Sequence, residues 1–120
     1  MMDNKTIKSS EGVIEILTLS LKPGTRDRFH HLYVTEALPL LKKWKFQVVA
    51  HGPSLHDENS YYVIRYFKSV EDRQISEDAY YNSDDWRIGP RTDILKLIEH
   101  EAYTVIHAET LKEWTDIITK

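Results

Sequence analysis

The stretch Ser60–Arg73, SYYVIRYFKSVEDR, decides the fold that the rest of the chain completes. Its first half, Tyr61–Phe67, is rich in aromatic and β-branched residues, which is typical of a buried central strand. Its second half has Ser69 followed three residues later by Asp72, a capping pattern that predicts the start of a helix. A strand that runs directly into a helix indicates the architecture, but it does not identify a reaction.

The composition favours a single domain and excludes several classes of function. The chain has 120 residues, no cysteine and a formal net charge of −3. Its length suits one domain whose core needs no disulfide. The lack of cysteine excludes thiolate metal sites and a cysteine nucleophile, and it agrees with the cytoplasmic location that we expect. The signs of charge are interspersed and no apolar run reaches about 20 residues, so we expect no nucleic-acid partner and no membrane span.

Hydrophobic periodicity predicts the element order β-α-β-β-α-α-β, between a flexible leader at 1–11 and a C-terminal tail. The predicted strands and helices are strands 13–21, 46–51, 61–67 and 101–108, and helices 26–43, 70–80 and a third from about 84. Pro39 should kink the first helix, because proline lacks the N–H donor and clashes with the preceding turn. Gly89-Pro90 should bend or break the third helix.

This order predicts an α+β, ferredoxin-like domain over residues 12–108, with a four-stranded antiparallel sheet and helices on one face. Both faces of the predicted strands are apolar or aromatic, whereas the helices can cover one of them. We therefore expect a homodimer, in which a second copy of the chain covers the bare face.

Residues 109–120 are predicted to form an extra C-terminal docking helix. Thr110 and Glu113 make a capping box, and Leu111, Trp114 and Ile117 fall on one apolar stripe behind it. A helix this short is unstable alone, so the stripe must dock on another surface. That surface is either the edge of its own sheet or the second subunit, and we favour the second subunit.

Five segments, in this order, resemble the NIPSNAP family of the dimeric α+β-barrel superfamily. They are VIEI at 13–16, LKPG at 21–24, ALPLLKK at 37–43, YFKSVEDR at 66–73 and DDW at 84–86. The resemblance spans about Gly12–His107 and implies a ferredoxin-like protomer whose sheet pairs with that of its mate to close a barrel. It implies little about chemistry, since the superfamily also contains cofactor-independent monooxygenases, haem-degrading enzymes and dye peroxidases. Two positions depart from the family's pattern, where an arginine and a tryptophan are replaced by Leu17 and Arg65.

Strand alternation places Glu15, His51 and Arg65 on one face, which we assign to the second subunit. The predicted dimer face comprises Glu15, Leu17, Leu19 and Phe67. A buried glutamate and a buried arginine must pair, so one interpretation is a Glu15–Arg65 ion pair that fixes the register of the dimer. The alternative is a catalytic site in which Arg65 clamps an anion or carbonyl and His51 acts as general base.

The opposite face is assigned to the helices, where large aromatic side chains could line a cleft. The predicted pocket residues are Tyr33, Tyr62, Tyr66 and Trp86. In the related monooxygenases this cleft holds the substrate. The plainer interpretation is an ordinary aromatic core, since large aromatic residues usually fill cores.

The histidines do not show the spacing of a metal site, since no two lie at i, i+4, and we predict neither a metal nor a cofactor. Haem binding through His51, His100 or His107 stays open. The favoured function is a NIPSNAP-like homodimer that binds a small apolar or aromatic molecule. The alternatives are a cofactor-independent, monooxygenase-like enzyme and a purely structural or interaction dimer.

Overall fold

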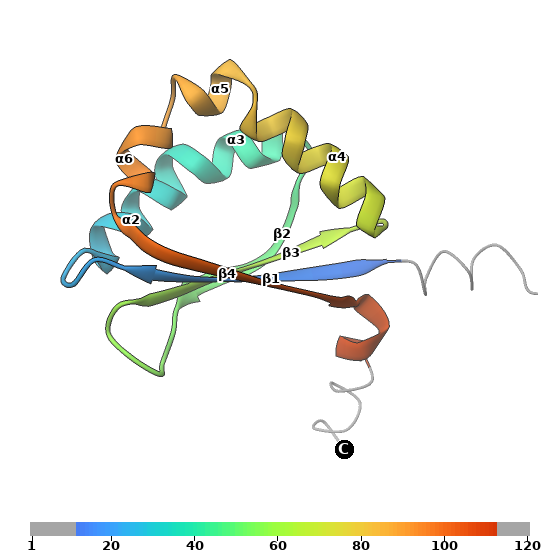
Figure 1. Ribbon diagram of the computed structural model, residues 1–120, viewed down its shortest axis with the longest axis horizontal. Coiled ribbons are helices and arrows are strands. Elements are labelled where there is room, and N and C mark those ends of the chain that lie inside the picture. The colour runs from blue at the N-terminus through green and yellow to red at the C-terminus, as the bar shows by residue number, and fades with distance from the viewer. Residues whose placement is uncertain (1–11, 113–120) are drawn as a thin grey trace, which may run out of the picture.

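A four-stranded antiparallel sheet carries the helices that lie between its first and last strands on one side (Figure 1). The computed structural model describes residues 12–112. The strands are β1 (Val13–Leu21), β2 (Gln47–Pro53), β3 (Ser60–Phe67) and β4 (Ile98–His107), in the order β2-β3-β1-β4. The predicted α+β, ferredoxin-like sheet is confirmed, and β3 lies inside it as the aromatic run indicated.

The first helical segment changes its winding near Pro39. It consists of α2 (Arg26–Leu32), a π-helical segment η1 (Tyr33–Ala37) and α3 (Leu38–Lys43). Pro39 lies in the first turn of α3, where its missing N–H leaves no hydrogen bond unmade. The interruption predicted at Pro39 therefore takes the form of a wider π turn just before it, and this turn carries the buried Tyr33.

The helix that follows the central strand begins where the capping pattern predicted. In α4 (Val70–Tyr81), the side chain of Ser69 accepts a hydrogen bond from the backbone N–H of Asp72 at 3.0 Å. This bond satisfies one of the free amide groups of the first turn. Strand β3 and helix α4 are thus joined with two residues between them, which fixes the helix close above the sheet.

The third predicted helix is divided into α5 (Asp84–Arg87) and α6 (Arg91–Leu95), as Gly89-Pro90 indicated. A Cβ atom at Gly89 would collide with the backbone carbonyl oxygen of Asp85, so the turn requires glycine there. Lys43 and Trp44 both donate to Asp85 Oδ2 at 2.9 Å, which ties α5 to the end of α3. These links close the helical layer above the sheet.

The core lies between the sheet and this helical layer, and it corrects the assignment of the two faces. Glu15 pairs across the strands with Arg65, as alternation predicted, but both are buried beneath the helices. The residues predicted for the dimer face are all buried on this helix side: Glu15, Leu17, Leu19 and Phe67. Alternation correctly placed Glu15 and Arg65 on one face, but that face was assigned to the second subunit, whereas it lies under the helices and α4 supplies further partners for the pair.

The bare face of the sheet carries Tyr62 and Tyr66, which the sequence placed in the cleft. Each ring lies close to a glycine: a Cβ at Gly12, just before β1, would come within 2.7 Å of the Tyr66 hydroxyl, and one at Gly52 in β2 within 3.4 Å of the Tyr62 hydroxyl. These two tyrosines therefore do not line the sheet–helix cavity. The bare face is otherwise apolar at its centre, where Ile16 pairs with Ile64.

Helical residues 108–112 follow β4 and lie on the side of the sheet opposite α2–α6 (Figure 1). The rest of the predicted C-terminal docking helix, and the predicted leader at 1–11, lie outside the described residues. The surface on which the predicted helix would dock, the edge of its own sheet or the second subunit, stays a prediction.

Candidate functional site

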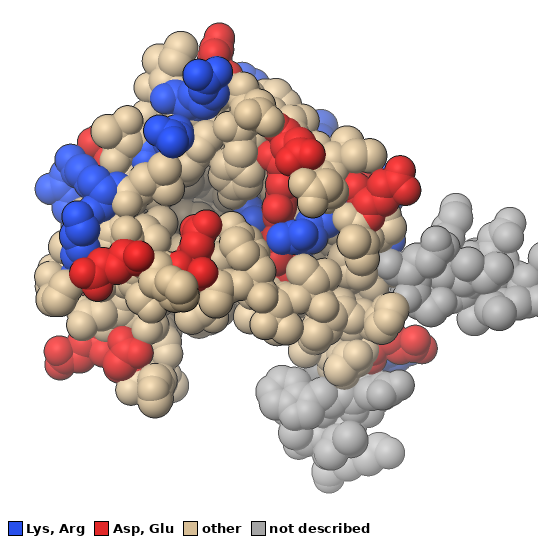
Figure 2. Space-filling model, in the orientation of Figure 1, with Lys and Arg blue, Asp and Glu red and all other residues tan. Residues whose placement is uncertain are grey.

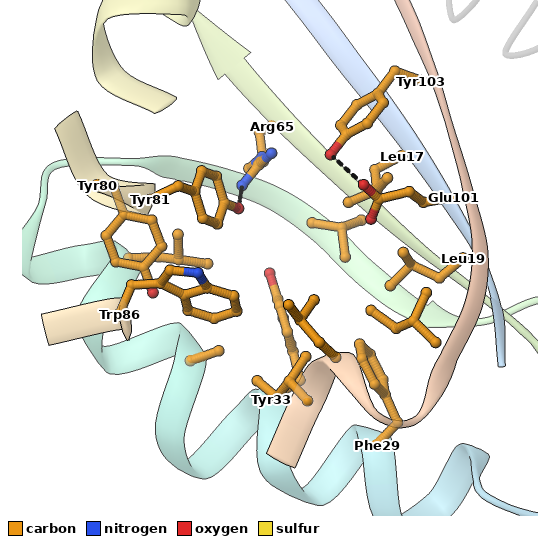
Figure 3. A pocket seen from close by; sticks show the side chains of 16 residues that line it. Leu17, Leu19, Phe29, Tyr33, Arg65, Tyr80, Tyr81, Trp86, Glu101 and Tyr103 are labelled. Atoms are coloured by element: carbon orange, nitrogen blue, oxygen red, sulfur yellow. Dashed lines mark hydrogen bonds between the residues drawn. The ribbon is translucent and has the colours of Figure 1, made fainter. Parts of the chain in front are cut away.

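A cavity of about 250 Å³ lies between the sheet and the helical layer. Figure 2 shows a hollow on this face, between the helices above and the sheet below. The walls of the cavity are largely apolar and come from β1, β3, β4 and the helical layer. They include Leu17, Leu19, Phe29, Val63, Trp86 and Ile94. Of the predicted pocket residues, Tyr33 and Trp86 line this cavity (Figure 3).

Two buried tyrosine hydroxyls on the helical side of the cavity lack hydrogen-bond partners among the described residues. They belong to Tyr33, which the π segment carries, and to Tyr80 near the end of α4. Burial raises the pKa of both phenols, so both stay protonated and able to donate. A buried hydroxyl without a partner costs free energy, which makes these groups natural contacts for a polar atom inside the cavity.

Arg65 reaches the cavity from the sheet side, on β3, and is 1% exposed. Its Nε donates to Glu15 Oε1 at 2.7 Å, its Nη2 to Glu77 Oε2 at 3.1 Å, and its Nη1 to the hydroxyl of Tyr81 at 2.9 Å. Arg73 donates to the second oxygen of Glu15 at 2.7 Å. The Glu15–Arg65 pair predicted from alternation is present, but it forms inside one protomer as part of a larger cluster.

The two carboxyl groups of this cluster have opposite pKa shifts. Burial, the hydrogen bond to Glu15 and the nearby Glu15 charge raise the pKa of Glu77 to about 8, against the pull of Arg65. Burial also acts on Glu15, but hydrogen bonds from Glu77, Arg73 and Arg65 and the Arg65 charge hold its pKa below the ordinary value. Glu77 lies 3.1 Å from Arg65 and 3.4 Å from Arg73, and its raised pKa weakens the negative charge that it sets against the two arginines.

His51 and Arg65, the predicted catalytic pair, are not brought together. His51 Nδ1 hydrogen-bonds with the hydroxyl of Tyr61 at 2.9 Å, and His30 Nδ1 contacts the same hydroxyl at 2.8 Å. Burial and the His30 charge lower the pKa of His51. Arg65 lines the cavity and His51 does not, so His51 is not placed to act as a base on a molecule held there.

Sequence reasoning missed the residues of α4 that complete the cluster. Arg73, Glu77 and Tyr81 are spaced by four residues, so they share one face of the helix. The four-residue spacing is visible in the sequence, but α4 was expected only to pack on the core. The Glu15–Arg65 pair below it was assigned to the other side of the sheet.

The mouth of the cavity is formed in part by β4. The hydroxyl of Tyr103 donates to Glu101 Oε1 at 3.4 Å, and the guanidinium of Arg73 lies 5.5 Å from the centre of the Tyr103 ring. Both β4 side chains are exposed, since the helices do not cover this edge strand. The entrance is therefore polar, whereas the walls behind it are apolar (Figure 3).

Residues 12–112 contain no group of three or more histidine, aspartate or glutamate side chains arranged to hold a metal ion. Nor does that range contain a helix both long and apolar enough to cross a membrane.

Solved structures share this arrangement of sheet and helices. A NIPSNAP family protein from Agrobacterium tumefaciens superposes with a TM-score of 0.75 at 21% identity, over 82% of this chain and 88% of its own. A NIPSNAP-like domain protein from Burkholderia xenovorans also gives 0.75, at 13% identity over 81% and 84%.

The fold is that of the NIPSNAP proteins. The NIPSNAP-like fold that the sequence resemblance implied is thus confirmed. A putative antibiotic biosynthesis monooxygenase from Bordetella bronchiseptica has the same architecture, with a TM-score of 0.65 at 18% identity over 81% of this chain and 96% of that one. No protein-family model matches the sequence, and no curated protein matches it. The comparisons therefore give the NIPSNAP-like fold, and the site must be interpreted from its own geometry.

Proposed function

We propose that this NIPSNAP-like chain is a homodimeric, cytoplasmic binding protein that holds a small apolar or aromatic molecule in the cavity between sheet and helices. The observation that carries this proposal is an apolar cavity of about 250 Å³ into which the buried hydroxyl of Tyr33 projects, without a partner among the described residues (Figure 3). A well-packed core avoids both features, because empty volume and unpaired polar atoms each cost free energy.

The size of the cavity limits the ligand to a small molecule. At about 30 Å³ for each water, 250 Å³ corresponds to roughly eight waters. That space lies just below the range of about 300–1,000 Å³ for ligand pockets, so it suits a molecule of one or two rings. The apolar walls favour rings or hydrocarbon over a sugar or a nucleotide.

Binding can be tested by filling the cavity. Ala37 is buried and lines it, so Ala37→Leu should occupy part of the space and weaken the binding of small aromatic probes. Ala79→Leu makes the same change at an exposed position of α4 and serves as the matched control. Probe binding can be followed through the fluorescence of Trp86 in the cavity wall. Equal binding by the two variants would contradict the proposal.

We infer the homodimer from the bare face of the sheet. The centre of this face is apolar, and α2–α6 do not cover it. Sedimentation should give twice the chain mass of 14.2 kDa at micromolar concentration. Ile64→Glu puts a charge at the centre of this face and should give monomers, whereas Val49→Glu, on an exposed residue of the edge strand, should not. A wild-type chain that sediments as a monomer would refute the dimer.

The second candidate is an oxygen-dependent enzyme acting on the bound molecule. The fold shared with the Bordetella bronchiseptica protein and the position of Arg65 and Tyr81 at the cavity favour it. Oxygen uptake with a quinol probe, lost in Tyr81→Phe, would support catalysis. Binding without turnover would leave the binding function.

A further inference from the structure

The inner end of the cavity, where Tyr33 and Tyr81 lie, carries hydrogen-bond donors that have no acceptor among the described residues. Tyr81 hydrogen-bonds among the described residues with Arg65 alone, and in that bond the guanidinium donates and the hydroxyl oxygen accepts. The proton of Tyr81 is therefore left to be donated elsewhere. The hydroxyl of Tyr33 has no partner at all among those residues, and Figure 3 shows both hydroxyls directed into the same cavity.

Two unused donors that face one space define an acceptor site. A ligand oxygen placed between them would accept both hydrogen bonds and remove the cost of leaving the two hydroxyls unpaired. The bond from Arg65 polarises the hydroxyl of Tyr81 and makes it a stronger donor. Such donors bind a negatively charged oxygen more strongly than a neutral one.

The charges around the site also favour an anion. Arg65 and Arg73 pair with Glu15 and Glu77, and the raised pKa of Glu77 weakens the negative charge that opposes the two arginines. The opposing charge is that of Glu101 at the mouth, but this side chain is exposed to water, which screens it. An anion at the inner end would therefore neutralise a buried positive charge, which a neutral ligand leaves uncompensated.

We propose that the ligand is a small aromatic acid of one or two rings, whose anionic oxygen accepts hydrogen bonds from Tyr33 and Tyr81 while Arg65 supplies the compensating charge. The rings of Phe29 and Trp86 in the walls suit the flat apolar part of such a molecule. This inference rests on the proposed binding function and names the chemistry of its ligand.

The test compares three probes of nearly the same shape on the full-length protein: β-naphthoate, β-naphthamide and β-methylnaphthalene. Hydrogen bonds to a charged group discriminate by roughly ten-fold or more, so we expect β-naphthoate to bind at least ten-fold more tightly than the other two. The affinities of p-nitrophenolate and its neutral analogue p-nitrotoluene are compared in the same way. Tighter binding of p-nitrophenolate would show that the site also accepts a phenolate oxygen.

Tyrosine-to-phenylalanine variants remove the donors without changing the shape of the cavity. Tyr33→Phe and Tyr81→Phe should each weaken β-naphthoate about ten-fold and leave β-methylnaphthalene unchanged, whereas Tyr62→Phe on the bare face should change neither. Both variants keep Arg65 and its ion pairs. Tyr33→Phe removes a hydroxyl that has no partner among the described residues, so it tests the site without disturbing the cluster. Tyr81→Phe also removes the acceptor of Arg65 Nη1, so its stability is measured by urea unfolding beside its affinity.

The outcomes separate this inference from the function on which it rests. Equal affinity for all three naphthalene probes would overturn the aromatic acid and leave the binding function standing. Failure of every probe to bind would overturn both. Preferential binding of β-naphthoate that survives both cavity Tyr→Phe changes would overturn the role given to the two hydroxyls.

Discussion

Protonation of Glu77 should make the protein more stable at acid pH than at alkaline pH, and Glu77→Gln should abolish that difference. The pKa of this carboxyl rises from the ordinary value of 4.5 to about 8 in the folded chain. Between these two values the folded protein holds a proton that the unfolded chain has released, so the free energy of unfolding falls as pH rises. At about 1.36 kcal/mol for each pH unit, the whole loss amounts to up to about 5 kcal/mol.

Glutamine has nearly the shape of a protonated glutamate and stays neutral at every pH. Urea unfolding from pH 5 to pH 9 should therefore show similar stability for the variant and the wild type at the acid end. At the alkaline end the variant should be the more stable by several kcal/mol. Glu99→Gln, at an exposed position of β4, controls for the change in net charge. A Glu77→Gln variant less stable than wild type at pH 9 would refute the reasoning, because it would mean that an ionised Glu77 pairs favourably with the arginines.

Three further substitutions test local features. Tyr33→Phe removes an unpartnered buried hydroxyl and should raise the free energy of unfolding of the free protein by about 1 kcal/mol; a decrease would reveal a partner for that hydroxyl. Ser69→Ala removes the cap of α4 and should cost about 1 kcal/mol in urea unfolding, so an unchanged midpoint would contradict the cap. Gly89→Ala forces a Cβ against the carbonyl of Asp85 and should lower stability by about 2 kcal/mol or more, which thermal unfolding would measure.

The parts of the fold that depend on local chemistry were predictable from the sequence. The bounds of β1 were predicted because Pro23-Gly24 ends that strand, and the start of α4 because Ser69 caps it. The break at Gly89-Pro90 was equally local. The end of β2 was predicted two residues early, because Gly52-Pro53 was interpreted as the start of a loop, whereas both residues pair with β3.

Which face of the sheet packs against the helices was not predictable in the same way. Alternation along β1 and β3 separates Glu15 and Arg65 from Tyr62 and Tyr66, but it does not say which set meets the helices. The tyrosines were expected to point inward because aromatic residues usually fill cores. The structure reverses this, because Tyr81 and Glu77 on α4 make a buried arginine acceptable, while Tyr62 covers a glycine on the bare face.

The position of the charged cluster beside the cavity is hard to explain by stability alone. Moving two arginines and two glutamates out of water costs several kcal/mol for each ion, and apolar residues of similar volume often serve a core as well or better. The cluster does, however, hold Tyr81 in place through Arg65 and leaves its hydroxyl, which is directed into the cavity, free to donate (Figure 3). It also keeps one carboxyl protonated, so that the positive charge near the cavity is not fully cancelled. A ligand that carries a negative oxygen would supply the missing counter-charge. Binding of such a ligand would explain why the buried ions are present, which packing alone does not.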